Sequence, residues 1–103
     1  MNDKSSLQVS DEQAASVQKT ENRVTLESIQ SKIAEVEYVN PKAAPHMTIA
    51  IVKLTNGYIV LGESAPADPE NFNAELGQKF ALENATRKIW PMEGYLLCEK
   101  LAA

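Results

Sequence analysis

The chain has 103 residues, with 14 acidic and 10 basic side chains and a formal net charge of −4. This length accommodates one domain and excludes a two-domain enzyme or a doubly wound nucleotide-binding sheet. The longest apolar run, Met47–Val52, is far shorter than the ~20 residues of a membrane-spanning helix. The negative net charge argues against sequence-independent DNA binding, which needs a basic face.

The first 22 residues are polar and contain no aromatic side chain. Such a segment buries too little apolar surface to offset the entropy of ordering it. We therefore predict a disordered or weakly helical tail over residues 1–22 and a single α+β domain over 23–103. A core of this size often depends on an oligomer interface.

The start of the chain also lacks the continuous apolar stretch of a secretory signal. Cys98 is the only cysteine, so no internal disulfide can form, and a lone thiol fits a reducing compartment. We therefore expect the protein to work in a cytoplasm, without a membrane partner.

The first strong periodicity predicts an amphipathic helix over 25–37. Four apolar residues recur there at spacings of three and four, namely Leu26, Ile29, Ile33 and Val36. Asn40-Pro41 would stop this helix, which places Tyr38 at its end.

A β-hairpin is predicted next, because two apolar runs, Met47–Leu54 and Tyr58–Leu61, flank Asn56-Gly57. Asn-Gly is typical of a two-residue type I′ turn, which would place Lys53 opposite Val60. One face would then be wholly apolar and pack on helices, with Ala50, Val52, Leu54, Ile59 and Leu61. The other face would be mixed, at an interface or around a ligand.

Two C-terminal helices complete the predicted order. Asp68-Pro69-Glu70 has the pattern of a helix start, and apolar residues follow at helical spacing as far as Ile89. Pro91 is expected to end that helix and to open a last one. The order of helix, hairpin, helix and helix is an α+β fold, which we expect to assemble as a homo-oligomer.

Catalytic chemistry is poorly represented. The four glycines are too scattered for a phosphate-binding loop, and one His and one Cys, His46 and Cys98, make no metal set. The carboxylates offer no facing pair for acid–base catalysis. A Cys98–His46 nucleophile pair is conceivable, but an inert, packed thiol is the more common role of a cysteine on an apolar helix face. We therefore expect no enzyme, no metal and no cofactor.

The residues that remain form a set suited to binding. Lys53 and Thr55, two positions apart and about 7 Å along a strand, can share a phosphodiester. Tyr38 offers a ring on which a base can stack, an interaction worth roughly 1–3 kcal/mol. Arg87 and Lys88 can add positive charge.

Each of these residues also has a purely structural interpretation. Lys53 is the kind of charge that protects an edge strand from aggregation. Tyr38 can be a packing residue at a helix end, and Arg87-Lys88 a pair that complements a helix dipole.

Three segments carry a family resemblance: NGYIVLGESA, DPENFNAELGQKFALENA and KIWPMEGYLLCEKL. They resemble small tailed-phage proteins of the gene-forty-nine/gene-sixty-six family over about 47–101, and more weakly over the helix before it. This family includes the anti-CBASS sponges, small oligomers described as hexamers that sequester cyclic dinucleotides and trinucleotides of bacterial antiphage immunity without cleaving them.

The resemblance implies the same role here, in the host cytoplasm. The dinucleotide contacts of the family are a helix-end tyrosine, a strand lysine and a threonine two positions later, which match Tyr38, Lys53 and Thr55. The trinucleotide pocket of some members cannot be placed in this way, and Arg87 and Lys88 are assigned to ligand binding by their chemistry alone.

Two rival functions remain open. A non-enzymatic phage accessory protein would bind a host protein through the mixed hairpin face and Tyr58. A small hydrolase would turn its ligand over, whereas a sponge would release it intact.

Overall fold

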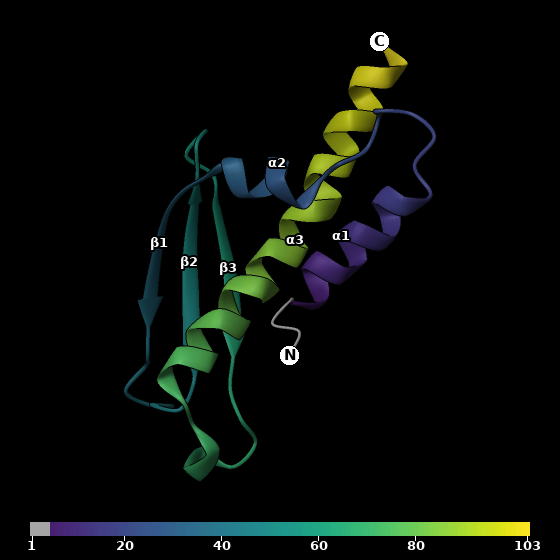
Figure 1. Ribbon diagram of the computed structural model, residues 1–103. Helices are drawn as coiled ribbons and strands as arrows, with labels where there is room; N and C mark the ends of the chain where they lie inside the picture. Colours follow the sequence, from purple (N-terminus) through teal and green to yellow (C-terminus); the bar gives the residue numbers. More distant parts are fainter. Residues whose placement is uncertain (1–4) are drawn as a thin grey trace.

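The computed structural model describes residues 5–103, and Figure 1 shows the order of the elements. They are α1 (Ser6–Ser16), α2 (Leu26–Ser31), β1 (Ile33–Val39), β2 (Thr48–Leu54), β3 (Ile59–Ser64), the 3-10 turn η1 (Pro69–Asn71) and α3 (Ala74–Ala102). The strands form one antiparallel sheet in the order β1-β2-β3. The α+β class is therefore confirmed, whereas the individual elements differ from the prediction in three places.

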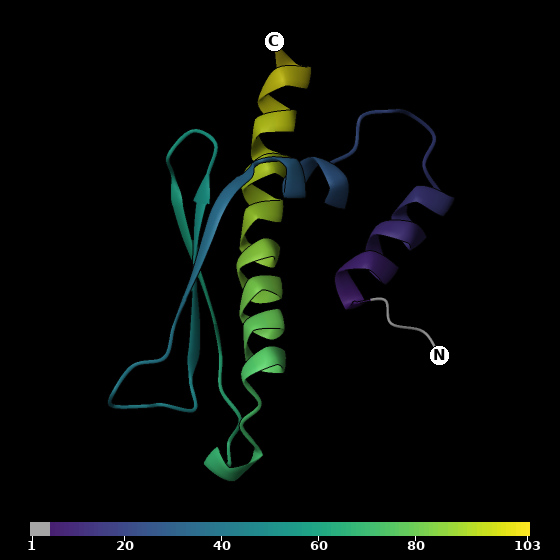
Figure 2. The ribbon, with the colours of Figure 1, turned by 60° about the vertical axis from the view of Figure 1, so that its left-hand side comes forward.

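The long helix α3 lies against one face of the sheet, which we call the inner face. The short helix α2 packs against α3 and β1, and α1 lies farther from the sheet, beyond α3 (Figure 2). The core forms where α3 packs on this face. Its fully or nearly fully buried members are Ile29, Ala50, Val52, Leu54, Val60, Ala81, Ala85 and Ile89. The opposite, outer face of the sheet is covered by no described element, so its side chains are available for contacts outside the protomer.

The predicted helix over 25–37 is wrong in its second half. The helix α2 ends at Ser31, and residues 33–39 form the edge strand β1. A β-bulge between Ile33 and Glu35 lets Ile33 and Val36, three positions apart, both pack against the core. This bulge reproduces the three-residue spacing of a helix, which explains the error.

The β-hairpin is confirmed, but its register is one residue from the predicted one. The loop has three residues, Thr55 to Gly57, closed by a 2.9 Å bond from the Gly57 amide to the Leu54 carbonyl. Gly57 has a φ of +91°, which suits the last position of such a loop. Lys53 therefore pairs with Ile59. A one-residue shift reverses every side chain of β3, so Val60 is buried and Leu61 is exposed.

The predicted pair of C-terminal helices is one continuous helix, α3, with Pro91 inside it. The Asp68 side chain does accept from the Glu70 amide, at 3.0 Å, but it caps only the turn η1. Asn73 is the N-cap of α3. Ile89 is fully buried just before Pro91, and Met92 packs against the core just after it. This packing on both sides of the proline holds the chain helical.

We expect Pro91→Ala to stabilise the protein. Proline cannot donate the helical bond to the Arg87 carbonyl and is about 3 kcal/mol less favourable than alanine inside a helix. Pro91 is exposed, so its replacement disturbs no core contact. Urea denaturation should show a gain of about 1–3 kcal/mol. The matched control is Pro69→Ala at the start of η1, where proline is favourable and no gain is expected; an equal gain in both variants would contradict the argument.

The segment 1–22, expected to be a disordered or weakly helical tail, contains α1. The helix starts with a capping box in which Ser5 and Gln8 exchange hydrogen bonds of 3.2 and 2.8 Å. Leu7 is its one buried residue. Asp11 attaches it to the domain by accepting from the Leu26 amide at 3.0 Å and by pairing with Arg23 at 2.8 Å. The division of the chain at residue 22 stays a prediction.

The attachment of α1 should depend on pH. Burial acts to raise the pKa of Asp11, but the hydrogen bonds from Arg23 and the Leu26 amide and the Arg23 charge outweigh it and hold that pKa below 3.8. Because the pKa of Asp11 is lower in the attached form, its ionised carboxylate stabilises this form at pH values above the ordinary pKa. This stabilisation is lost as the pH falls through the lowered pKa. Hydrogen exchange at the Leu26 amide should therefore quicken, relative to the intrinsic rate, below about pH 4. In Asp11→Asn this pH dependence should disappear; an unchanged profile would contradict the assignment.

Among residues 5–103, no helix is long and apolar enough to cross a membrane.

Candidate ligand-binding surface

The outer face of the sheet is a three-by-three array of side chains. Cross-strand pairing sets its rows, which are Glu35–Lys53–Ile59, Glu37–Ile51–Leu61 and Val39–Ile49–Glu63. The outer face of an antiparallel sheet is ordinarily polar. Here five of the nine side chains are apolar, and Ile59 and Leu61 are 48% and 49% exposed. Such a face is typical of an interaction surface.

Lys53 is the one cation of this array. It is exposed, and within the described part of the chain its side chain makes no hydrogen bond or ion pair. It contributes, with Glu35, Glu37, Ile51 and Ile59, to a shallow pocket of about 180 Å³. Two carboxylates beside one ammonium make the pocket of a single protomer a weak site for an anion.

Tyr38 lies on the inner face of the sheet. It pairs with Ala50 and is half-buried against the core. The prediction that it ends a helix is therefore wrong, because it lies within β1. Lys53 lies on the opposite face and three positions from Ala50, about 10 Å along β2. One protomer does not bring the two side chains together, so a pocket containing both needs two protomers.

Thr55 lies in the hairpin loop rather than on the strand. It is exposed, and its backbone amide donates to the Lys32 carbonyl at 2.8 Å. This bond ties the loop to the end of α2. Thr55 follows Lys53 closely in the chain, but the expectation that the two share one strand face is wrong because the strand ends at Leu54.

Arg87 and Lys88 are both exposed on α3 and already have partners within the protomer. Arg87 donates to the Ser6 hydroxyl of α1. Lys88 donates to the Leu61 carbonyl at 2.8 Å, and Asn84 accepts from the Glu63 amide at 3.0 Å. Lys88 and Asn84 thus form hydrogen bonds to backbone groups on the free edge of β3. These bonds keep the same groups from pairing with another strand.

The next features are the groups that could bind a metal ion and the single thiol. Residues 5–103 contain no cluster of three or more His, Cys, Asp or Glu side chains that could hold a metal ion. Cys98 is exposed on α3, so the expectation of a packed thiol is wrong.

Ile59 and Leu61, which make the outer face apolar, are predicted to lie in the core by the two-residue turn, and this prediction is wrong. Val60 and Gly62 are buried in their place. The Thr-Asn-Gly sequence carried a signal for the correct register, since a glycine closing a three-residue loop is the next most common hairpin turn after the two-residue one.

The fold and surface define a small α+β protein whose three-stranded sheet carries a long helix on one face and an uncovered, largely apolar surface with a single lysine on the other. A family model describes residues 24–101, most of the chain, and the protein belongs to the phage protein (N4 Gp49/phage Sf6 gene 66) family. No curated protein and no solved structure has significant similarity to it. The helix α1 precedes the matched region.

Proposed function

We propose that this protein binds and sequesters cyclic oligonucleotide immune signals, cyclic dinucleotides and also trinucleotides, in the host cytoplasm. Family membership supports the proposal, together with the order Tyr38, Lys53, Thr55 that matches the dinucleotide contacts of the sponge proteins. The observation that carries it is the position of Lys53, a cation without an ion pair within residues 5–103, on an uncovered apolar surface.

The proposed pocket forms between two protomers. Tyr38 of one protomer stacks on a base, while Lys53 and Thr55 of the next hold a phosphate. This pocket needs two copies because Tyr38 and Lys53 lie on opposite faces of the sheet. A second copy also excludes water from Lys53, which strengthens its attraction to phosphate.

Self-association is part of this proposal, and a hexamer is expected from the family. Large apolar side chains are exposed at the outer face and at the C-terminal end of α3, where Tyr95, Leu96 and Leu101 are 66%, 56% and 56% exposed. Burying such surface contributes about 25 cal/mol per Å². Analytical ultracentrifugation should therefore give a multimer; a monomer at micromolar concentration would contradict the proposal.

Isothermal titration with cyclic GMP-AMP and cyclic triadenylate tests the ligand. We expect binding without turnover, so chromatography should recover the ligand intact after the complex is denatured. Sequestration acts by mass action, which requires tighter binding than that of the host effector. No heat with a panel of cyclic oligonucleotides, or recovery of hydrolysed ligand, would exclude a sponge.

A second candidate function is the binding of a host protein by the outer face. The five apolar side chains of that face favour it, since such a surface suits a protein partner. Recovery of one stoichiometric host protein with the purified chain, lost in Leu61→Lys, would favour this function over the sponge.

A further inference from the structure

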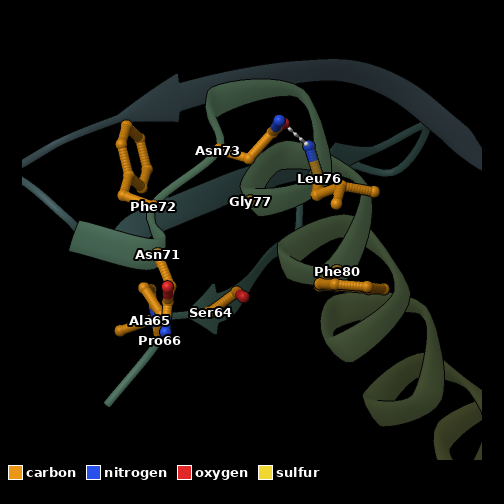
Figure 3. Close-up of a pocket in the computed structure, with 9 residues that line it drawn as sticks. All are labelled: Ser64, Ala65, Pro66, Asn71, Phe72, Asn73, Leu76, Gly77 and Phe80. Carbon is orange, nitrogen blue, oxygen red and sulfur yellow. Dashed lines mark hydrogen bonds between the residues drawn. The ribbon is translucent and has the colours of Figure 1, made fainter. Parts of the chain in front are cut away.

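A second pocket of the described residues lies at the end of the sheet away from Lys53. It has a volume of about 280 Å³ and forms where the segment after β3 passes the start of α3 (Figure 3). Thr48, at this end of β2, is five residues from Lys53, about 17 Å along the strand. None of the five predicted ligand residues lines the pocket, so it is a separate site.

The lining of this pocket is apolar and aromatic and carries no charge. Pro66, Phe72, Leu76 and Phe80 supply most of its apolar side chains, and no Asp, Glu, Lys or Arg contributes. A charged group placed here would lose hydration without gaining a partner. The occupant is therefore uncharged where it touches the pocket. Phe80 is 48% exposed, which leaves ring surface for stacking.

Three small polar side chains, Ser64, Asn71 and Asn73, interrupt the apolar lining. The Asn73 carboxamide oxygen accepts from the Leu76 amide at 2.9 Å, which fixes this side chain and leaves its NH₂ group to donate. Within residues 5–103, the Asn71 carboxamide and the Ser64 hydroxyl have no hydrogen-bond partner. The pocket thus offers donors and acceptors beside aromatic surface.

We propose that this pocket binds an uncharged nucleobase. A flat ring stacks on phenylalanine, and its edge pairs with carboxamides, as asparagine does with adenine. A purely hydrocarbon ring would leave the carboxamides unpaired, which costs affinity. The volume is near the lower end for ligand pockets and suits one base.

Adenosine and guanosine, which are neutral, are the probes. In NMR titrations of the full chain we expect saturable shifts at the Phe72 and Phe80 rings and at the Asn71 carboxamide. Phe80→Ala and Asn71→Leu should each weaken binding at least fivefold. Gln78→Ala, which truncates an exposed residue of α3 outside the pocket lining, should leave it unchanged.

Lys53→Ala separates this inference from the sponge proposal, because nucleoside binding should survive it. Absence of shifts with both nucleosides would overturn the inference, whether or not cyclic oligonucleotides bind elsewhere. Equal affinity for toluene and adenosine, or full binding by Asn71→Leu, would also overturn it, since the pocket would then accept any apolar group, such as a side chain of a second copy.

Discussion

Gly62→Ala should abolish stable folding. A Cβ atom at Gly62 would lie 2.1 Å from the Ala81 carbonyl oxygen and 2.5 Å from the Ala85 amide nitrogen. Both are backbone atoms of α3, so no rotation of a side chain relieves the clash. The strand and the helix must separate, which opens the core around Ala85. We expect a loss of at least about 3 kcal/mol, at the upper end for overpacking.

Thermal and urea denaturation followed by circular dichroism measure this effect. Gly94→Ala is the matched control, because a Cβ there has nothing within 4 Å. Alanine is favoured over glycine inside a helix, so this variant should gain up to about 1 kcal/mol. Native-like unfolding of Gly62→Ala would show that β3 and α3 do not approach as closely as described.

Lys53→Ala should weaken the binding of cyclic dinucleotides at least about 30-fold. Truncation of one partner of a desolvated charge pair costs roughly 2 kcal/mol or more. The side chain is exposed in the protomer and makes no ion pair within the described residues, so its loss should leave stability unchanged. Titration calorimetry measures the affinity, and ultracentrifugation checks that the oligomer persists.

Lys79→Ala is the control for charge, because it removes one exposed lysine from α3, away from the outer face. Its affinity should match that of the unmodified protein. If both variants bind equally well, the phosphate site is not at Lys53. If both lose affinity equally, the ligand responds to net charge rather than to a defined contact.

Local sequence patterns determined the hairpin and the inner face of β2. Strict alternation buries Ala50, Val52 and Leu54, and this pattern depends only on the two-residue period of a strand. Asparagine and glycine at 56 and 57 marked the turn, because few residues other than glycine adopt a positive φ. The helical residues 74–89 were likewise evident from their spacing.

The candidate site could not be placed in the same way. The order of Tyr38, Lys53 and Thr55 in the chain was readable, but their relative positions depend on which face of the sheet each occupies. The bulge in β1 assigns Tyr38 to the inner face, and the end of β2 at Leu54 leaves Thr55 in the loop. Neither the bulge nor the end of the strand produces a repeating pattern that can be recognised in the sequence.

Only the tertiary structure decided the conformation of residues 33–39 and of the chain around Pro91. Glu35, Glu37 and their apolar neighbours satisfy both a helical and an extended pattern, and pairing with β2 selects the strand. A proline disfavours helix locally, but burial of Ile89 and packing of Met92 outweigh its cost. Local preferences are nearly balanced in residues 33–39 and oppose the helix at Pro91, so in both segments contacts with residues distant in the chain determine the outcome.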